Sequence, residues 1–342
     1  MSSPTGTSTH AIQITITVIA IVANVLGLVA VNAFKKKQKS LNDTTNKTNP
    51  TTNHDATRIL SWEQKRAYYW ALMFGMTFLG VWTDARYNIS AGWLFVKCYA
   101  FAFPLGLLDL YFSNVQVSLR VLPGAALWCS TLFIQKWLSR LYFGRSIPVQ
   151  IVISLSPTTI CFQELPRFVT QLLGVGLFSD FFFSPMHRFV HSPKLYKAWH
   201  KEHHSYTNDL TALVLYHGHL GDDFLMPFTT AIGGTVYEML LSLFGMEDQG
   251  LSNFALYLIS FNILLSHAHD LRCARLLAPL PDELNYVAYH YVHHISPANN
   301  FGLTEPSDRL WDWILGVDTI RKVDSFEQQQ PSSMTTTLKK AE

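Results

Sequence analysis

The chain has 342 residues, of which 49% are hydrophobic and 15% are charged, whereas ordinary soluble domains carry about 25% charged residues. Together with a mean hydropathy of +0.14, this composition indicates an integral membrane protein with soluble parts. The net charge of +2 is too small to suggest a nucleic-acid partner, and the four scattered cysteines, which form no C-x-x-C pair, indicate neither a disulfide framework nor a zinc ribbon.

The N-terminal region is expected to contain a transmembrane anchor at residues 12–34, because this apolar run is long enough to cross a hydrocarbon core of roughly 30 Å. No Lys or Arg precedes the run, whereas lysines follow it directly within residues 35–39. The positive-inside rule therefore predicts that residues 1–11 form a luminal tail and that the lysines are cytosolic. Residues 35–65 are expected to be a polar linker, since their Asn- and Thr-rich composition cannot build a core.

Membrane helices are predicted within residues 66–167, where charges and prolines interrupt the apolar runs and leave the number of spans open. Further along, two apolar arms at 224–244 and 251–266 are separated by the charged turn GMEDQG. With a rise of 1.5 Å per residue the arms would reach roughly 31 Å and 24 Å, enough to cross or nearly cross a bilayer. Such a hairpin returns to the side from which it entered, so the sequence segments on either side of it would share one face of the membrane.

The C-terminal segment 318–342 is polar and is expected to be a flexible cytosolic tail. It finishes with Lys339-Lys340-Ala341-Glu342, which resembles the dilysine retrieval signal of endoplasmic reticulum membrane proteins. That signal is read in the cytosol. The chain is therefore predicted to be a multi-pass protein of the endoplasmic reticulum membrane with a cytosolic C-terminus.

Histidine placement is the most informative feature of the chain, because twelve of the fourteen histidines lie between His187 and His294. They form the clusters HRFVH, HKEHH, YHGHL, SHAHD and HYVHH. Residues three and four apart share a helix face, so HRFVH can give two rings to one metal, and each triplet can give two rings to one metal and a third to its neighbour. A mononuclear site rarely uses more than three or four histidines. The eight imidazoles of HRFVH, HKEHH and HYVHH therefore predict two metals, although imidazole suits zinc, copper, iron and nickel alike.

The order of these clusters resembles the fatty acid hydroxylase/sterol desaturase superfamily over about residues 168–317. The motifs H-x3-H, H-x2-H-H and H-x2-H-H occur in the family's order, and LTALVLYH follows the second. Asn300-Phe301-Gly302 and the stretch LWDWILG at 310–316 are similar to the family's trailing signatures. The resemblance implies an all-α integral membrane protein, in which a transmembrane helix bundle carries a cytosolic helical cap with a histidine-rich dimetal site. The catalytic domain would span residues 168–317, with the histidine clusters on the cytosolic side.

Nine histidines are predicted to bind metal: His187, His191, His200, His203, His204, His267, His290, His293 and His294. Three further histidines are candidate ligands: His217, His219 and His269. The stretch LSHAHDLR resembles the family's third histidine box, in which the family more often has Asn at the position of His269. Whether His267 or His269 supplies the ligand of this third box stays open. Asp180 and Asp270 are candidates to accept a hydrogen bond from a ligating imidazole and fix its tautomer. For Asp180 the alternative is a helix-end aspartate that faces water. Asp222 and Asp223 could also hydrogen-bond a ligating imidazole, but a loop position explains Asp222, Asp223 and Asp270 equally well.

The function that the resemblance implies is an oxidation of a membrane lipid by two iron ions and O2, either hydroxylation or desaturation. A sterol is the first expected substrate, and a fatty acyl chain or sphingolipid is the alternative. The chain has no HPGG haem motif, so a separate cytochrome b5 and an NAD(P)H reductase are the expected electron donors. Two other kinds of protein stay open, namely a membrane metal carrier and an inactive family member. The sequence does not indicate the oligomeric state.

Overall fold

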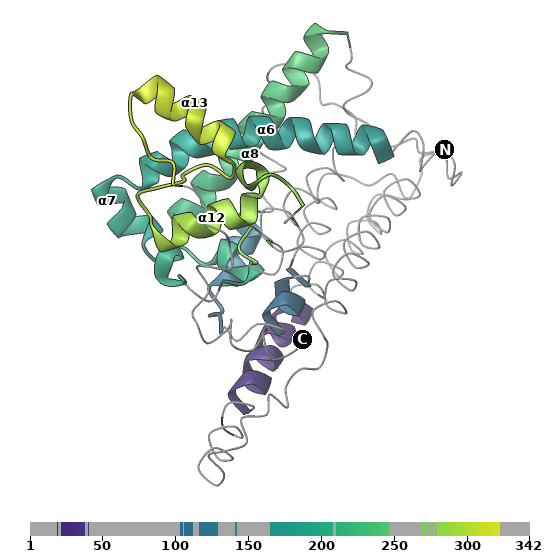
Figure 1. Ribbon diagram of the computed structural model, residues 1–342. Coiled ribbons are helices and arrows are strands. Elements are labelled where there is room, and N and C mark those ends of the chain that lie inside the picture. Colours follow the sequence, from purple (N-terminus) through teal and green to yellow (C-terminus); the bar gives the residue numbers. More distant parts are fainter. Residues whose placement is uncertain are drawn as a thin grey trace, which may run out of the picture.

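The computed structural model of the chain describes residues 19, 22–37, 40, 103–104, 106–111, 116–128, 141, 165–207, 210–245, 268–270, 274, 277 and 279–321. Within these ranges the chain is helical and contains no strand (Figure 1). The predicted anchor is helical over 22–37. Much of the predicted membrane region 66–167, the apolar arm 251–266 and the tail beyond residue 321 lie outside the described residues, so the multi-span bundle stays a prediction.

Two long helices form the frame on which the histidines are arranged. Helix α6 (Leu165–Val190) packs against helix α8 (Leu220–Leu243) (Figure 1). Their backbones meet closely at Gly233, where an added Cβ would lie 2.5 Å from Ser179 Cα. At a second contact Gly174 of α6 lies under the ring of Tyr237 in α8. Glycine at Gly233 therefore permits an approach of the two helices that any larger residue would prevent.

Helix α8 is also the part of the described chain that could cross a bilayer. Among the described residues it is the one helix whose length and apolar composition would allow this, and half of its most apolar stretch is buried inside the protein. Glu238, the charged residue within this stretch, is itself buried. A single such helix is weak evidence for a membrane span, but it agrees with the composition of the chain.

Short turns connect α6 to α8 and carry several of the histidines. In chain order they are α7 (Pro193–Leu195), the π-helical turn η2 (Tyr196–His200) and the 3-10 turns η3 (His203–Ser205) and η4 (Ala212–Tyr216). Proline is favoured in a first helical turn, where its missing N–H is not needed, and Pro193 begins α7 accordingly.

Three elements complete the described structure on the C-terminal side: η5 (Asp282–Leu284), α12 (Tyr286–Ile295) and α13 (Glu305–Leu315). Helix α12 begins after Asn285, whose side chain accepts a hydrogen bond from Ala288 N. Helix α13 ends at Gly316, which adopts the left-handed conformation with φ 66° that glycine tolerates best. In Figure 1, α12 and α13 lie on the same side of the molecule as α7.

Candidate metal centre

Nine histidine side chains converge in two adjoining groups. The first group comprises His187, His191, His200, His204 and His293, and the second comprises His203, His269, His290 and His294. Within each group the candidate ligand nitrogens lie within 4.8 Å of one another. Two nitrogens on opposite sides of one ion, each at about 2.1 Å, would stand about 4.2 Å apart. Each group therefore has the dimensions of the coordination sphere of one metal ion.

The histidines enter the two groups according to their spacing in the sequence. Helix α6 gives His187 and His191, four residues apart, to the first group. Helix α12 gives His290 and His294, also four apart, to the second group, whereas His293 points to the first. Each triplet thus sends its outer pair to one group and its middle histidine to the other. The spacing predicted a division of two rings and one, and the structure shows which rings stay together.

The triplet HKEHH achieves the same division without a regular α-helix. Lys201 N donates to Tyr196 O at 2.7 Å, the wide i to i+5 bond of a π turn, and a 3-10 turn follows at His203–Ser205. His200 and His204 join the first group and His203 joins the second. Such π turns are rare in proteins as a whole. Those that occur are often found at functional sites, where they change the direction of side chains within a helix.

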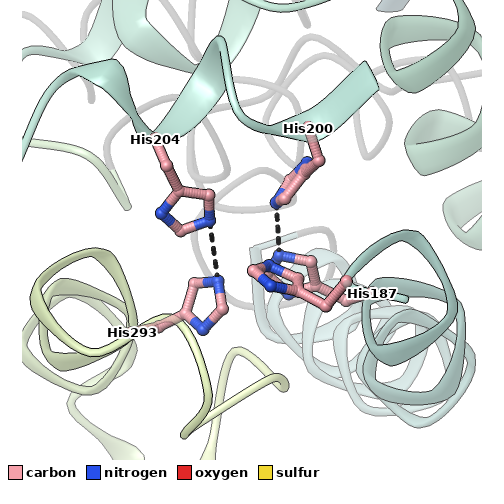
Figure 2. Close-up of side chains that lie close together, drawn as sticks. His187, His200, His204 and His293 are labelled. Carbon is pink, nitrogen blue, oxygen red and sulfur yellow. Dashed lines mark hydrogen bonds between the residues drawn. The ribbon is translucent and has the colours of Figure 1, made fainter. Parts of the chain in front are cut away.

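The hydrogen bonds of His187 and His200 determine which of their nitrogens can bind metal. His187 Nδ1 lies 2.6 Å from Phe301 O, and His200 Nδ1 lies 2.8 Å from Asp222 Oδ2. A carbonyl and a carboxylate only accept, so both Nδ1 atoms carry the proton and both Nε2 atoms present a lone pair. These two Nε2 atoms face each other at 3.0 Å (Figure 2). Two facing lone pairs repel each other unless a cation lies near both, so this pair is arranged for a metal ion.

In a second pair of the first group the Nε2 atoms also face each other, and the proton of one of the two rings is fixed on Nδ1. His293 Nδ1 donates to Asn299 O at 2.7 Å, which leaves a lone pair on Nε2, and that atom faces His204 Nε2 at 3.1 Å (Figure 2). In the described part of the chain, no hydrogen-bond partner reaches His191 Nε2 or His204 Nδ1, although both atoms are buried. Leaving a buried polar atom unsatisfied costs about 1–3 kcal/mol. A bound metal would remove this cost at His191.

The second group contains the same kind of conflict. His269 Nε2 lies 3.2 Å from His203 Nε2 and 3.1 Å from His290 Nε2. One Nε2 proton can satisfy only one of these two contacts, so at least one of them sets nitrogens together without a proper hydrogen bond. His294 Nδ1 donates to Tyr206 O at 3.2 Å, and within the described residues its buried Nε2 has no partner. The second group therefore also fits a cation.

Burial keeps these imidazoles in the neutral form that binds metal. Desolvation lowers the pKa of His191 to about 2, that of His293 to about 3 and that of His203 to about 4. The neighbouring imidazoles lower these pKa values further, because each ring would be repelled by a charged neighbour. All three rings are consequently neutral at physiological pH, as metal ligation requires.

Two candidate ligands, His217 and His219, are described by the structure and are not part of either group. His217 is buried and packs against Tyr206, with ring centroids 4.9 Å apart. His219 is exposed, accepts a hydrogen bond from Gly221 N at 3.0 Å and stacks on Trp199. His267 lies outside the described residues. The structure thus brings His269 into the second group and gives His219 the local role of capping α8.

Asp180 was expected either to accept a hydrogen bond from a ligating imidazole or to face water at a helix end, but it is buried and accepts from other groups. Its carboxylate accepts from Leu303 N at 2.6 Å, and from Thr304 N and Oγ1 at 3.0 and 2.6 Å. The physical reason is that the N–H groups at the start of α13 lack helical partners and attract a carboxylate. Asp180 therefore holds the segment that carries Phe301, whose carbonyl binds His187. Asp270 is fully buried beside His269.

Asn300 turns this segment so that two carbonyls face the first group. It has φ 52°, a left-handed conformation that Asn tolerates better than most residues. Arg321 N donates to Asn300 Oδ1 at 2.8 Å, and Asn300 Nδ2 donates to Arg321 O at 3.1 Å. The carbonyls on either side, those of Asn299 and Phe301, then accept from His293 and His187.

A buried carboxylate that the sequence interpretation did not single out joins α6, α12 and α13. Asp308 accepts from Ser184 Oγ at 2.6 Å, Arg188 Nη2 at 2.8 Å, Tyr289 OH at 2.9 Å and Gly302 N at 2.8 Å. Arg188 also pairs with Asp312 at 2.8 Å. The available signal was the spacing of Asp308 and Asp312, which puts two acidic residues on one face of the LWDWILG helix. Their partner could not be identified, because Arg188 lies more than a hundred residues away in sequence.

The comparisons with known proteins agree with this geometry. Residues 172–317 match the model of the fatty acid hydroxylase family, and all nine clustered histidines lie within the match. The match confirms the resemblance to the fatty acid hydroxylase/sterol desaturase superfamily for this part of the chain. No curated protein and no solved structure matches the chain. The two histidine groups and the family together fit iron binding.

Proposed function

We propose that this chain, whose residues 172–317 match the fatty acid hydroxylase family, is an oxidoreductase that uses two irons and O2 to hydroxylate or desaturate a membrane lipid. The observation that carries the proposal is the pair of adjoining histidine groups in which buried Nε2 atoms face one another. Iron bound in the two groups would supply the O2 chemistry, while the protein supplies geometry and a dry environment.

The chain's own residues would hold the ligands in position and limit access of water. Asp222, Asn299 and Phe301 each accept from an Nδ1 atom and so direct the opposite nitrogen of that ring into the first group. The Phe301 ring lies against His191 and His293, with centroid distances of 5.3 and 5.6 Å. This apolar wall supports a site in which a C–H bond is oxidised away from bulk water.

The proposed reaction requires a source of electrons. Hydroxylation inserts one oxygen atom of O2 into a C–H bond and releases the other as water, which consumes a pair of electrons and a pair of protons. We propose an external cytochrome b5 and an NAD(P)H reductase as their source, because the sequence carries no HPGG haem motif.

The substrate that we propose first is a sterol, with a fatty acyl chain or sphingolipid as the second candidate. The apolar composition and α8 support a membrane location. A multi-pass arrangement in the endoplasmic reticulum, with the histidine groups on the cytosolic side, is part of the same proposal.

The two other kinds of protein that the sequence left open are less well supported. An inactive family member was suggested by the altered third box, but His269 of that box lies within the second group. A metal carrier must release its cargo, whereas several ligands here are held by hydrogen bonds to backbone carbonyls or a carboxylate. Fixed ligands of this kind suit a resident cofactor.

The direct test combines metal content with lipid profiling. We expect the purified full-length chain to hold about two irons, the number that two groups of this kind would bind. Expression in a strain lacking the endogenous activity should change its sterol or fatty acid profile. His293→Ala should lose iron and product, whereas His219→Ala, at an exposed histidine outside both groups, should retain both. A folded chain without bound metal, or a His293→Ala variant with full product formation, would contradict the proposal.

A further inference from the structure

Helix α13 has its polar face inside the protein and its apolar face outside. The buried side chains are Glu305, Ser307, Asp308 and Asp312. The exposed side chains include Leu310, Trp313, Ile314 and Val317, the last just beyond the helix end. Trp313 is 79% exposed. A surface helix of a soluble protein has the opposite arrangement, with its apolar stripe facing the core.

The inward face of α13 is determined by contacts that the helix cannot exchange for apolar packing. Arg188 of α6 lies between Asp308 and Asp312, at 2.8 Å from each carboxylate. Trp311 Nε1 donates to Phe181 O of α6 at 2.7 Å. Rotating α13 to bury Trp313 would leave Arg188, which is 12% exposed, without either carboxylate. The apolar face is therefore held outward by the same contacts that position α13.

The exposed apolar surface continues from α13 onto α6. Leu173 and Leu177 of α6 are 68% and 62% exposed. They share a helix face with Phe181 through their four-residue spacing, and the Phe181 ring packs against Trp311 with a centroid distance of 5.2 Å. Contiguous apolar surface of this kind marks a binding site for a partner or a membrane.

Two features of this surface favour a lipid bilayer as its occupant. A tryptophan next to an exposed basic residue, as in Trp313 and Arg309, is typical of helices that lie at the headgroup level. In addition, α8, which packs directly against α6, is the described helix with the length and composition to cross a bilayer. A membrane at α8 would thus be close to the outer surface of α6 and α13.

We propose that α13 lies in the interfacial layer of the membrane, with Leu310, Trp313 and Ile314 directed toward the acyl chains. The opposite face of the helix holds Gly302 and Arg188, which are neighbours of Phe301 and His187. One helix thickness, about 10 Å, then separates the lipid from the segment that supports the first histidine group. This inference concerns how the protein sits on the membrane and does not depend on the reaction proposed above.

The test uses the full-length chain in vesicles of phosphatidylcholine with a fraction of anionic lipid. Single cysteines at Leu310, Trp313 and Ile314 would carry a spin label, after the four native cysteines are replaced by serine. Lys197→Cys, at an exposed residue of η2, provides the control site. We expect O2 to relax the labels on α13 more than a water-soluble nickel complex does, and the reverse order at the control.

Two results would overturn the proposal. Labels on α13 that are reached best by the nickel complex would mean that the face is in water. Labels reached by neither reagent, with spin–spin broadening that disappears on dilution with unlabelled chain, would mean that a second copy covers it.

A second measurement avoids the cysteine replacements. The chain has nine tryptophans, so quenching by brominated lipid would be compared between the parent and Trp313→Phe. A larger quenched fraction in the parent supports the proposal, and equal fractions contradict it.

Discussion

Replacing Asp222 by Asn should weaken metal binding in the first histidine group. The Asp222 carboxylate is buried and accepts from His200 Nδ1 at 2.8 Å, which holds the His200 proton on Nδ1 and directs Nε2 toward His187. The amide of Asn can still accept this hydrogen bond through its oxygen, but it carries no charge to increase the basicity of the ring. If its NH2 group faces the ring instead, His200 must take the other tautomer and can no longer direct a lone pair from Nε2.

The expected size of this effect follows from the role of the contact. Loss of a hydrogen-bond partner of a metal ligand typically lowers metal affinity 10–100-fold, or about 1.4–2.7 kcal/mol. Only one ligand of the first group is affected, and none of the second. Under a competing chelator, the variant should therefore lose the iron of the first group well before that of the second, with a biphasic release that the parent does not show.

Asp223→Asn provides a matched control. Asp223 is the next residue, is equally buried, and belongs to neither histidine group. Iron per chain would be followed by elemental analysis during chelator titration, and the thermal midpoint of each metal-free variant would show whether folding is changed. Equal iron retention in the two variants, or parallel losses of stability and iron in both, would refute the role assigned to Asp222.

Three further changes test the structure around the site. Asp308→Asn should lower the free energy of unfolding by about 3 kcal/mol, the lower part of the range for breaking a buried ion pair, because Arg188 keeps its contact with Asp312. Chemical denaturation in detergent measures this change, and a loss below about 1 kcal/mol would contradict the role given to the contacts of Asp308. Gly233→Ala should destabilise the chain by about 1–3 kcal/mol through overpacking, since the added Cβ meets the Ser179 backbone. At Gly174 an added Cβ meets the movable ring of Tyr237, so Gly174→Ala should lower the thermal midpoint less. Acid should destabilise the metal-free protein: burial lowers the folded-state pKa of the clustered histidines below 6.5, so their contribution is complete above pH 6.5 and falls by about 1.4 kcal/mol per ring per pH unit below it. Unfolding free energies that stay constant between pH 7 and pH 5 would contradict this last prediction, and iron should move the loss of stability to lower pH.

The predictable part of the site came from local spacing. Residues four apart on one helix share a face, so the pairing of His187 with His191 could be expected from their positions along the chain. For each triplet the spacing predicted two rings at one metal and a third at its neighbour, but not which ring goes to which metal. The π turn of HKEHH was not expected, because the sequence pattern of a π turn does not differ from that of an α-helix. Asp180 was expected either to contact an imidazole or to face water at a helix end, and the structure places its carboxylate at Leu303 and Thr304.

The candidate metal ligands and the resemblance to the family were therefore accessible from the sequence alone, since histidine chemistry and i, i+4 periodicity are properties of short segments. The tertiary structure decided which segments share an ion, which acceptors hold each ring, and that α13 turns its polar face inward. These depend on contacts between residues more than a hundred positions apart, such as Arg188 with Asp308 and His187 with Phe301. Local pattern cannot specify such contacts, because the folding of the intervening chain determines which distant groups meet.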